Sequence, residues 1–156
     1  NDAARALFES FGFVGFRDLV VLQRHAAAAL PPFQDVDTDP LHDHTCAKML
    51  EHYVAGASWV AEPRSIIQSG GLTGFTLPSG RGWLICSVTA DQFEHIVVDP
   101  NADRATTYLL ICHLHALFPG YVTTVENIPA DSRLLPLYQS LGYTVAFRRV
   151  EMALRF

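Results

Sequence analysis

The 156-residue chain is 49% hydrophobic and 17% charged, which excludes a disordered segment and supplies enough apolar residues for a packed core. Its formal net charge of −5 and its single lysine, Lys48, leave no basic patch, so we expect no nucleic-acid partner. The apolar runs are too short to cross a bilayer, and we expect neither a membrane partner nor a secretory signal. Three widely spaced cysteines are typical of free thiols, which favours a cytoplasmic protein.

The first predicted element is a helix over residues 3–11, where apolar residues recur at helical spacing and Gly12 can end the helix. A β-rich stretch over residues 13–22 follows and is predicted to be a strand. An alanine-rich stretch then runs into Pro31 and Pro32, which break any helix there. The acidic residues 34–40 are typical of turns.

The middle of the chain is predicted to be a β-meander that follows a helix over residues 45–55. The turn residues around Pro78 join two of the strands as a hairpin. The predicted strands of this region cover residues 58–61, 65–68, 72–77, 83–88 and 93–98.

The last third of the chain alternates helices with strands. A helix over residues 105–118 joins the preceding strand to a strand over residues 121–125, which makes a crossover connection. A helix over residues 132–141 and a strand over residues 143–154 close the chain. Hairpins combined with a crossover predict an α/β (α+β) fold with a mixed, mostly antiparallel sheet and helices on both faces.

One stretch of the sequence occurs twice, because residues 131–154 echo residues 1–24. Each copy is predicted to be an amphipathic helix, a glycine that ends it, and an aromatic-rich strand, and such repeats set the architecture of a chain. The residues Leu137, Tyr138, Ser140, Gly142, Tyr143, Val150 and Met152 of the later copy correspond to Leu7, Phe8, Ser10, Gly12, Phe13, Val20 and Leu22 of the earlier one.

The later copy closes an ordered series of motifs. The run from Glu94 to Pro100 precedes the helix over residues 105–118 and the next strand, and Leu137-Tyr138-Gln139-Ser140-Leu141-Gly142-Tyr143 completes the series. In this order the motifs resemble the second half of the GNAT family (Gcn5-related N-acetyltransferases), whose closing signature is of the LYxxxGF type. The resemblance implies a splayed central sheet and an acyl-CoA-dependent N-acyltransferase that acts on a small-molecule or peptide amine.

The earlier copy also matches this family. Asn1, Ala4, Leu7 and Phe8 follow its N-x-x-A-x-x-L-[YF] spacing. We therefore expect residues 1–24 to be the tail of an upstream GNAT module and residues 25–156 to form a GNAT-like domain, the C-terminal module of a tandem protein. Two alternatives remain: the segment supplies a strand to this domain, or helix–glycine–strand units look alike by chance.

The resemblance assigns the catalytic roles to three residues. Tyr138 would be the general acid that protonates the departing thiolate, and its alternative role is an aromatic side chain packed on the sheet. Glu94 and His95 compete as the general base. Regular alternation along a strand places Glu94 on one face with Ile96 and Val98, and His95 on the other face with Val97, so only one of the two bases can face a given cleft.

The resemblance also implies acetyl-CoA, or another acyl-CoA, as co-substrate. Val97 and Val98 would offer backbone groups to the pantetheine arm, and Asn127 would line the same cleft. The turn that starts the helix would hold the pyrophosphate through backbone N–H groups. This turn consists of Asn101, Ala102, Asp103, Arg104, Ala105, Thr106 and Thr107. It contains no glycine, and Asp103 would repel phosphate, which favours an alternative function: a GNAT-like module that has lost catalysis and serves as a binding domain.

The acidic segment from Asp35 to Cys46 contains histidine and cysteine, but its spacing matches no common zinc site. Pro40 stands where a calcium loop needs glycine, so we expect no metal. The aromatic residues Phe8, Phe11, Phe13 and Phe16 must be covered, and we expect either a homodimer or packing on the upstream module.

Overall fold

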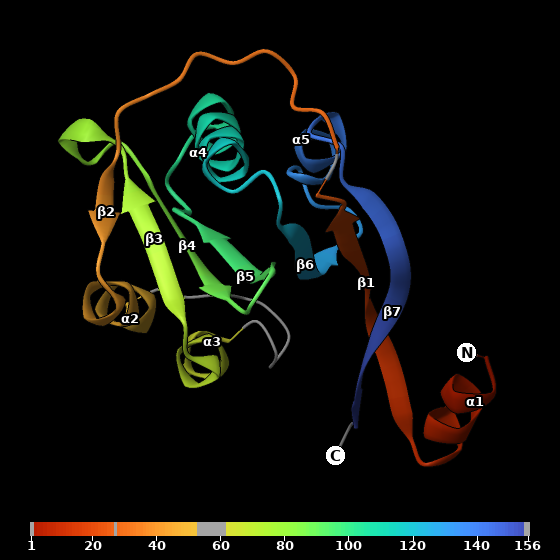
Figure 1. The fold of residues 1–156 in the computed structure, drawn as a ribbon. Coiled ribbons are helices and arrows are strands. Elements are labelled where there is room, and N and C mark those ends of the chain that lie inside the picture. The colour runs from red at the N-terminus through yellow and green to blue at the C-terminus, as the bar shows by residue number, and fades with distance from the viewer. Residues whose placement is uncertain (1, 27, 53–61, 155–156) are drawn as a thin grey trace.

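The computed structural model describes residues 2–26, 28–52 and 62–154. A seven-stranded sheet runs through it in the order β2-β3-β4-β5-β6-β1-β7 (Figure 1). The strands are β1 (Phe13–Arg24), β2 (Asp39–Leu41), β3 (Leu72–Thr76), β4 (Trp83–Val88), β5 (Gln92–Val98), β6 (Val122–Pro129) and β7 (Thr144–Leu154). The helices are α1 (Asp2–Ser10), α2 (Asp43–Glu51), α3 (Pro63–Ser69), α4 (Arg104–Leu117) and α5 (Leu135–Ser140), with a short 3-10 turn at Pro78–Gly80.

Helices cover both faces of the sheet, as the sequence predicted. On one face, α4 and α5 bury Leu110, Ile111 and Leu137 against β1 and the central strands. On the other face, α2 and α3 bury Leu50 and Ile66 in a smaller cluster. Every strand pair is antiparallel except β5 with β6, which are parallel. The mixed, mostly antiparallel sheet of the predicted fold class is therefore confirmed.

The N-terminal strand β1 lies inside the sheet rather than beside it. It pairs with β6 on one edge and with β7 on the other. Its second half is buried from Leu19 to Leu22, and Arg24 is only 2% exposed. The Arg24 guanidinium donates hydrogen bonds to the carbonyl oxygens of Leu141 and Ala28, which fastens the end of β1 to the end of α5. The sheet is complete only with this N-terminal strand.

Residues 28–38 lead to the far edge of the sheet and pass over α4, as the orange segment in Figure 1 shows. His113 on α4 holds this connection. Its Nδ1 lies 3.2 Å from Asp35 Oδ1, and its Nε2 lies 2.9 Å from Thr38 Oγ1. His115, two residues on, contacts Tyr143 instead, so the two helix histidines serve different neighbours.

Two local predictions differ from the structure. The predicted strand over residues 65–68 is part of the helix α3, because Pro63 favours the first turn of a helix and Ile66 is buried under the sheet. The edge strand β2 was not predicted, since its three residues include Pro40 in an acidic stretch. The predicted strand over residues 58–61 lies outside the described residues. No helix in the described part of the chain is long and apolar enough to cross a membrane.

Candidate functional site

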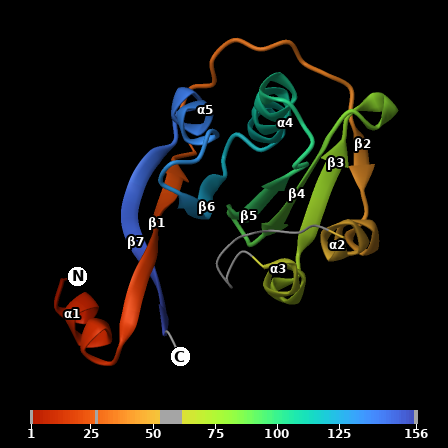
Figure 2. The same ribbon diagram turned by 180° about the vertical axis from the view of Figure 1, so that it is seen from behind.

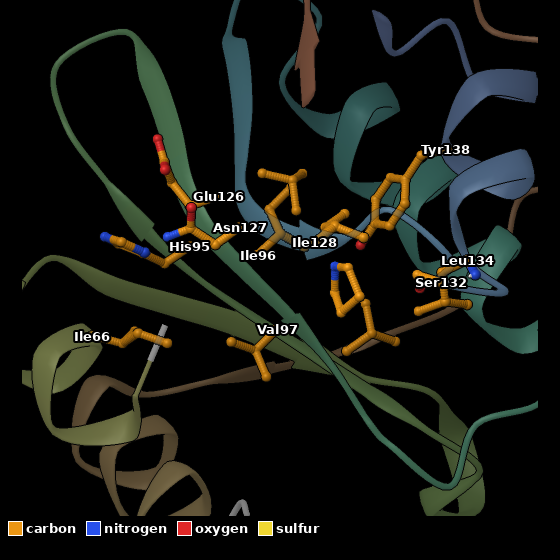
Figure 3. A pocket seen from close by; sticks show the side chains of 13 residues that line it. Ile66, His95, Ile96, Val97, Glu126, Asn127, Ile128, Ser132, Leu134 and Tyr138 are labelled. Carbon is orange, nitrogen blue, oxygen red and sulfur yellow. Dashed lines mark hydrogen bonds between the residues drawn. The ribbon is translucent and has the colours of Figure 1, made fainter. Parts of the chain in front are cut away.

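The sheet opens between the parallel strands β5 and β6. The two strands pair only where Gln92 meets Val122 and Phe93 meets Thr123, and they separate beyond these positions. A pocket of about 200 Å³ lies in the opening (Figure 3). Its lining consists of Ile66, His95, Ile96, Val97, Val98, Val125, Glu126, Asn127, Ile128, Pro129, Ser132, Leu134 and Tyr138.

A bulge in β5 shapes one wall of the pocket. His95 has a φ of 51°, in the left-handed region that residues other than glycine seldom adopt. The register with β4 shifts at the same place, between Ile85 and Ser87. Because of the extra residue, Phe93 and Ile96 both reach the core under α4, so that Glu94 points to the opposite face. The prediction from regular alternation, that Glu94 shares a face with Ile96, is therefore wrong.

The bulge separates the two predicted bases. His95 lines the pocket, and its Nδ1 is buried with no hydrogen-bond partner among the described residues. The Glu94 carboxylate is outside the lining and accepts a hydrogen bond of 2.7 Å from Gln92 Nε2. Of the two, His95 is the one that the tertiary structure presents to the opening.

A second bulge, in β6, shapes the other wall. Asn127 has a φ of 54°, and the register of β6 with β1 shifts between Val20 and Leu22, opposite this residue. Arg149 reaches over from β7 and donates to Asn127 Oδ1 at 2.8 Å and to Glu126 Oε2 at 2.5 Å. Strained residues held in place by their surroundings are common at binding and catalytic sites, and here one stands on each wall.

Tyr138 enters the pocket from α5, on the side opposite His95 (Figure 3). It is 3% exposed, and its ring meets that of Tyr143 edge to face with the centroids 5.1 Å apart. The Tyr143 hydroxyl lies 2.8 Å from His115 Nε2. Burial raises the pKa of Tyr143 well above its ordinary value, so this supporting phenol stays protonated and Tyr138 rests on a neutral, closely packed neighbour.

The predicted pyrophosphate turn lies at the start of α4, and its first helical N–H groups are already engaged. Asp103 is the N-cap residue, and its Oδ1 accepts a hydrogen bond of 2.7 Å from the Thr106 backbone. This bond lowers the pKa of Asp103, so that the cap is a carboxylate at neutral pH. Thr107 Oγ1 donates to the Asp103 carbonyl at 2.9 Å. The Asp103 carboxylate thus occupies the position that a bound anion would take.

The structure brings together Tyr138, His95, Val97, Val98 and Asn127 from the predicted site. The turn residues are placed elsewhere: Asn101 borders a separate open pocket with Lys48 and Trp83, and in the described part of the chain none of residues 102–107 lines the pocket between the strands.

Sequence reasoning missed Glu126 and Arg149. Glu126 and Asn127 interrupt the apolar strand β6, which was the available signal for a polar wall. Arg149 had no signal, because only the order of β6, β1 and β7 in the sheet brings it to Asn127.

The splayed strands fit the extended arm of an acyl thioester, because the edge of β5 facing β6 has no strand partner beyond Phe93 among the described residues. The α4 N-terminus is less suited to a diphosphate, because Asp103 places a negative charge there. Within the described residues, no group of histidine, cysteine and carboxylate side chains could hold a metal ion.

Comparisons with known proteins place the fold. No family model matches the sequence, and no curated protein matches it. Among solved structures, a GCN5-related N-acetyltransferase from Sphaerobacter thermophilus matches 96% of this chain with a TM-score of 0.63 and 16% identity. A putative GNAT acetyltransferase from Novosphingobium aromaticivorans matches 90% with a TM-score of 0.58 and 20% identity. A GCN5-related N-acetyltransferase from Kribbella flavida matches 97% with a TM-score of 0.61 and 11% identity.

The matched parts make up 55%, 65% and 63% of those three structures, so this chain spans less than two thirds of their lengths. The matches extend over 90–97% of this chain. The chain therefore has the fold of the GCN5-related N-acetyltransferases.

Proposed function

We propose that the pocket between β5 and β6 transfers an acyl group from an acyl-CoA thioester, acetyl-CoA in the first instance, to the amine of a small molecule or peptide. The observation that carries this proposal is the separation of two parallel strands at a pocket lined by Tyr138 and by the bulged residues His95 and Asn127. The exposed edge of β5 offers backbone N–H and C=O groups to an extended ligand arm. The fold supports acyl transfer in general terms, and the residues named below are part of the proposal.

The reaction joins an amine nitrogen to the acyl carbon and releases a thiol, so one group must take a proton and another must give one. His95 is the proposed base, because it lines the pocket, its buried Nδ1 lacks a partner among the described residues, and an imidazole nitrogen can accept a proton. Glu94 has weaker support, since it bonds to Gln92 outside the pocket lining.

Tyr138 is the proposed acid that returns a proton to the departing sulfur. Its ring is held by Tyr143 and by its burial, so that its position in the pocket is well defined. Arg149 is a positioning residue in this proposal, because its hydrogen bond to Asn127 holds the opposite wall in its strained conformation.

A second candidate function is binding without catalysis, as an interaction module of the same fold. The observation that favours it is the Asp103 carboxylate at the α4 N-terminus, which opposes the approach of a diphosphate. The two candidates differ in whether acyl-CoA binds and turns over.

A thermal-shift titration with acetyl-CoA separates the two functions. A ligand at a hundred times its Kd adds about 2.7 kcal/mol of stability, which raises the Tm of a domain this size by roughly 5–10 °C. Absence of a shift at millimolar acetyl-CoA would contradict the enzyme and favour the binding module.

Substitution of Tyr138 tests its role directly. Tyr138→Phe removes the hydroxyl and keeps the ring, so turnover should fall about 10²-fold or more while acetyl-CoA still shifts the Tm. Tyr121→Phe is the matched control, because Tyr121 stacks on Phe93 outside the pocket and its loss of a hydroxyl should leave turnover unchanged. Equal turnover of the two variants would remove Tyr138 from the mechanism.

A further inference from the structure

The repeated sequence is also a repeated structure. The rings of Phe8 and Phe13 meet edge to face at 5.5 Å and 71°, and those of Tyr138 and Tyr143 at 5.1 Å and 75°. In both copies a serine hydroxyl donates to a leucine carbonyl at 2.7 Å, from Ser10 to Leu7 and from Ser140 to Leu137. Gly12 and Gly142 end the two helices with φ of 86° and 84°. The helix α1 and strand β1 thus have the local design of α5 and β7.

The two helices differ in what covers them. In α5 and its cap, Leu137 is 1% exposed, Tyr138 3% and Leu141 0%. Their counterparts in the earlier copy are 57% exposed for Leu7, 48% for Phe8 and 68% for Phe11. The three residues of α5 and its cap belong to the main core cluster, together with Leu114 of α4 and Val125 of β6. α1 and its cap have apolar residues at the same positions of the repeat, and none of the described elements buries any residue of the helix.

The strands β1 and β7 pair with local two-fold symmetry. Val14 lies opposite Ala153, and Gln23 lies opposite Thr144. In the repeat, Thr144 of β7 corresponds to Val14 of β1, and Ala153 corresponds to Gln23. Exchanging the two strands therefore turns the pair Val14–Ala153 into the pair Thr144–Gln23. A rotation that exchanges the two strands therefore also exchanges their outer edges.

Only one of these two outer edges is occupied. β6 pairs with the outer edge of β1 through residues 19–24, while β7 is the last strand of the sheet in the described structure. Figures 1 and 2 show the far part of the β1–β7 ribbon, with α1 beside it, extending away from the other helices. A long, unpaired edge strand beside exposed aromatic residues invites another strand to add to it.

We infer that the outer edge of β7 and the apolar face of α1 bind a second unit of this same fold, of which α1 and β1 are the closing helix and strand. The occupant is the part of the natural polypeptide that precedes α1, and it contributes one strand antiparallel to β7 and one helix over Leu7, Phe8 and Phe11. β1 is then exchanged between the two units. This inference goes beyond the proposed acyl transfer and does not depend on it.

The charges around the surface agree with an apolar occupant. Arg5 pairs with Glu9 at 2.9 Å along α1, and Arg17 pairs with Glu151 across the ribbon, so these charges have partners within the chain. The exposed apolar side chains of the helix with its cap and of the two strands are Leu7, Phe8, Phe11, Val14, Phe16, Val145, Phe147, Val150 and Leu154.

The test compares the 156-residue chain with a polypeptide extended by whatever natural sequence precedes Asn1. Phe11→Asp should change the Tm of the 156-residue chain by no more than about 2 °C, because Phe11 is 68% exposed there. In the longer polypeptide the same substitution buries a charge and should lower the Tm by roughly 5 °C or more. Hydrogen exchange of the β7 amides should be at least about 10-fold slower in the longer polypeptide than in the 156-residue chain.

Leu117→Asp is the matched control, because Leu117 is 53% exposed on α4, away from this surface, and should have a small effect in both proteins. A longer polypeptide that tolerates Phe11→Asp, or one with no strand and helix before α1, would overturn the inference. Light scattering of the 156-residue chain identifies the other occupant: a dimer that Phe11→Asp dissociates would show that a second copy covers this surface, which also overturns the inference.

Discussion

At the residue scale, the junction of β1, α4 and α5 is held by buried polar side chains. Arg24 is 2% exposed and His115 is 1% exposed. Burial lowers the pKa of Arg24, and burial together with the charge of Arg24 lowers the pKa of His115 to about 3. His115 is therefore neutral in the folded protein and bonds to Tyr143, the residue against which Tyr138 packs.

This lowered pKa predicts how stability depends on pH. The unfolded chain takes up the proton of His115 near the ordinary value of 6.5, whereas the folded protein takes it up only near 3. The stabilisation of the fold by neutral His115 is therefore complete above about pH 6.5 and is lost as the pH falls toward 3. Over this range the free energy of unfolding should fall by roughly 1.4 kcal/mol per pH unit. Urea unfolding between pH 4 and pH 7 measures the slope.

A variant isolates the effect of His115 from the rest of the chain. His115→Gln keeps a group that can bond to Tyr143 and removes the titration, so its unfolding free energy should fall less steeply between about pH 6 and pH 4. His42→Gln, at an exposed position, is the control and should keep the original slope. A slope that is the same in both variants would show that His115 does not titrate as its burial requires.

Asp103 leads to a residue-scale prediction for the ligand. Because its pKa is lowered and its carboxylate caps α4, Asp103→Ser should keep a capping oxygen while removing the negative charge. We expect the Kd for acetyl-CoA to fall about 5-fold or more, from reduced repulsion at the helix N-terminus. Calorimetric titration measures it, with Asp91→Ser, on the exposed turn before β5, as the control. Weaker binding by the variant would show that the carboxylate helps rather than opposes the ligand.

At the element scale, the two bulges decide what the pocket contains. The apolar pattern of residues 93–98 predicted β5 correctly as a strand, yet alternation assigned Glu94 to the wrong face because a bulge inserts one residue. A bulge depends on how two strands pair, and the sequence of one strand does not contain that information. The same holds for Asn127 in β6.

Close packing between β3 and β4 provides an element-scale prediction. A Cβ added at Gly74 would lie 2.5 Å from the Leu84 carbonyl oxygen and 3.3 Å from Cys46 Sγ. Gly74→Ala should therefore destabilise the protein by about 1–3 kcal/mol or more, because backbone atoms must move apart. Gly120→Ala, where no atom lies within 4 Å, should stay within about 0.5 kcal/mol. Equal urea midpoints for both variants would show that β3 and β4 are not packed closely at Gly74.

At the scale of the whole molecule, the sheet depends on a strand from the opposite end of the chain. β1 has neighbours on both edges, and its buried half lies in the main core with Val20 and Leu22. The connection after it is held to α4 by His113. Tertiary contacts, and not the continuity of the backbone, therefore keep β1 in place.

Cutting the connection tests this dependence. With a protease site inserted after the exposed Pro32, the cleaved protein should remain one species in size-exclusion chromatography, because β1 is hydrogen-bonded on both sides. After unfolding in urea and dilution, recovery should fall relative to the uncut chain, since association of two fragments replaces a loop closure. Loss of the N-terminal fragment in native buffer would show that β1 is held weakly.

Local sequence patterns were enough to predict the order and kind of most elements, the repeat, and the family whose fold the chain has. These properties follow from local periodicity, glycine positions and short motifs, which depend on neighbours along the chain. The folded chain was needed to show that His95 faces the pocket, that Arg149 reaches Asn127, and that β1 completes the sheet. These three arise from pairing between strands far apart in sequence, and the register of such pairing is set by the packing of the whole sheet.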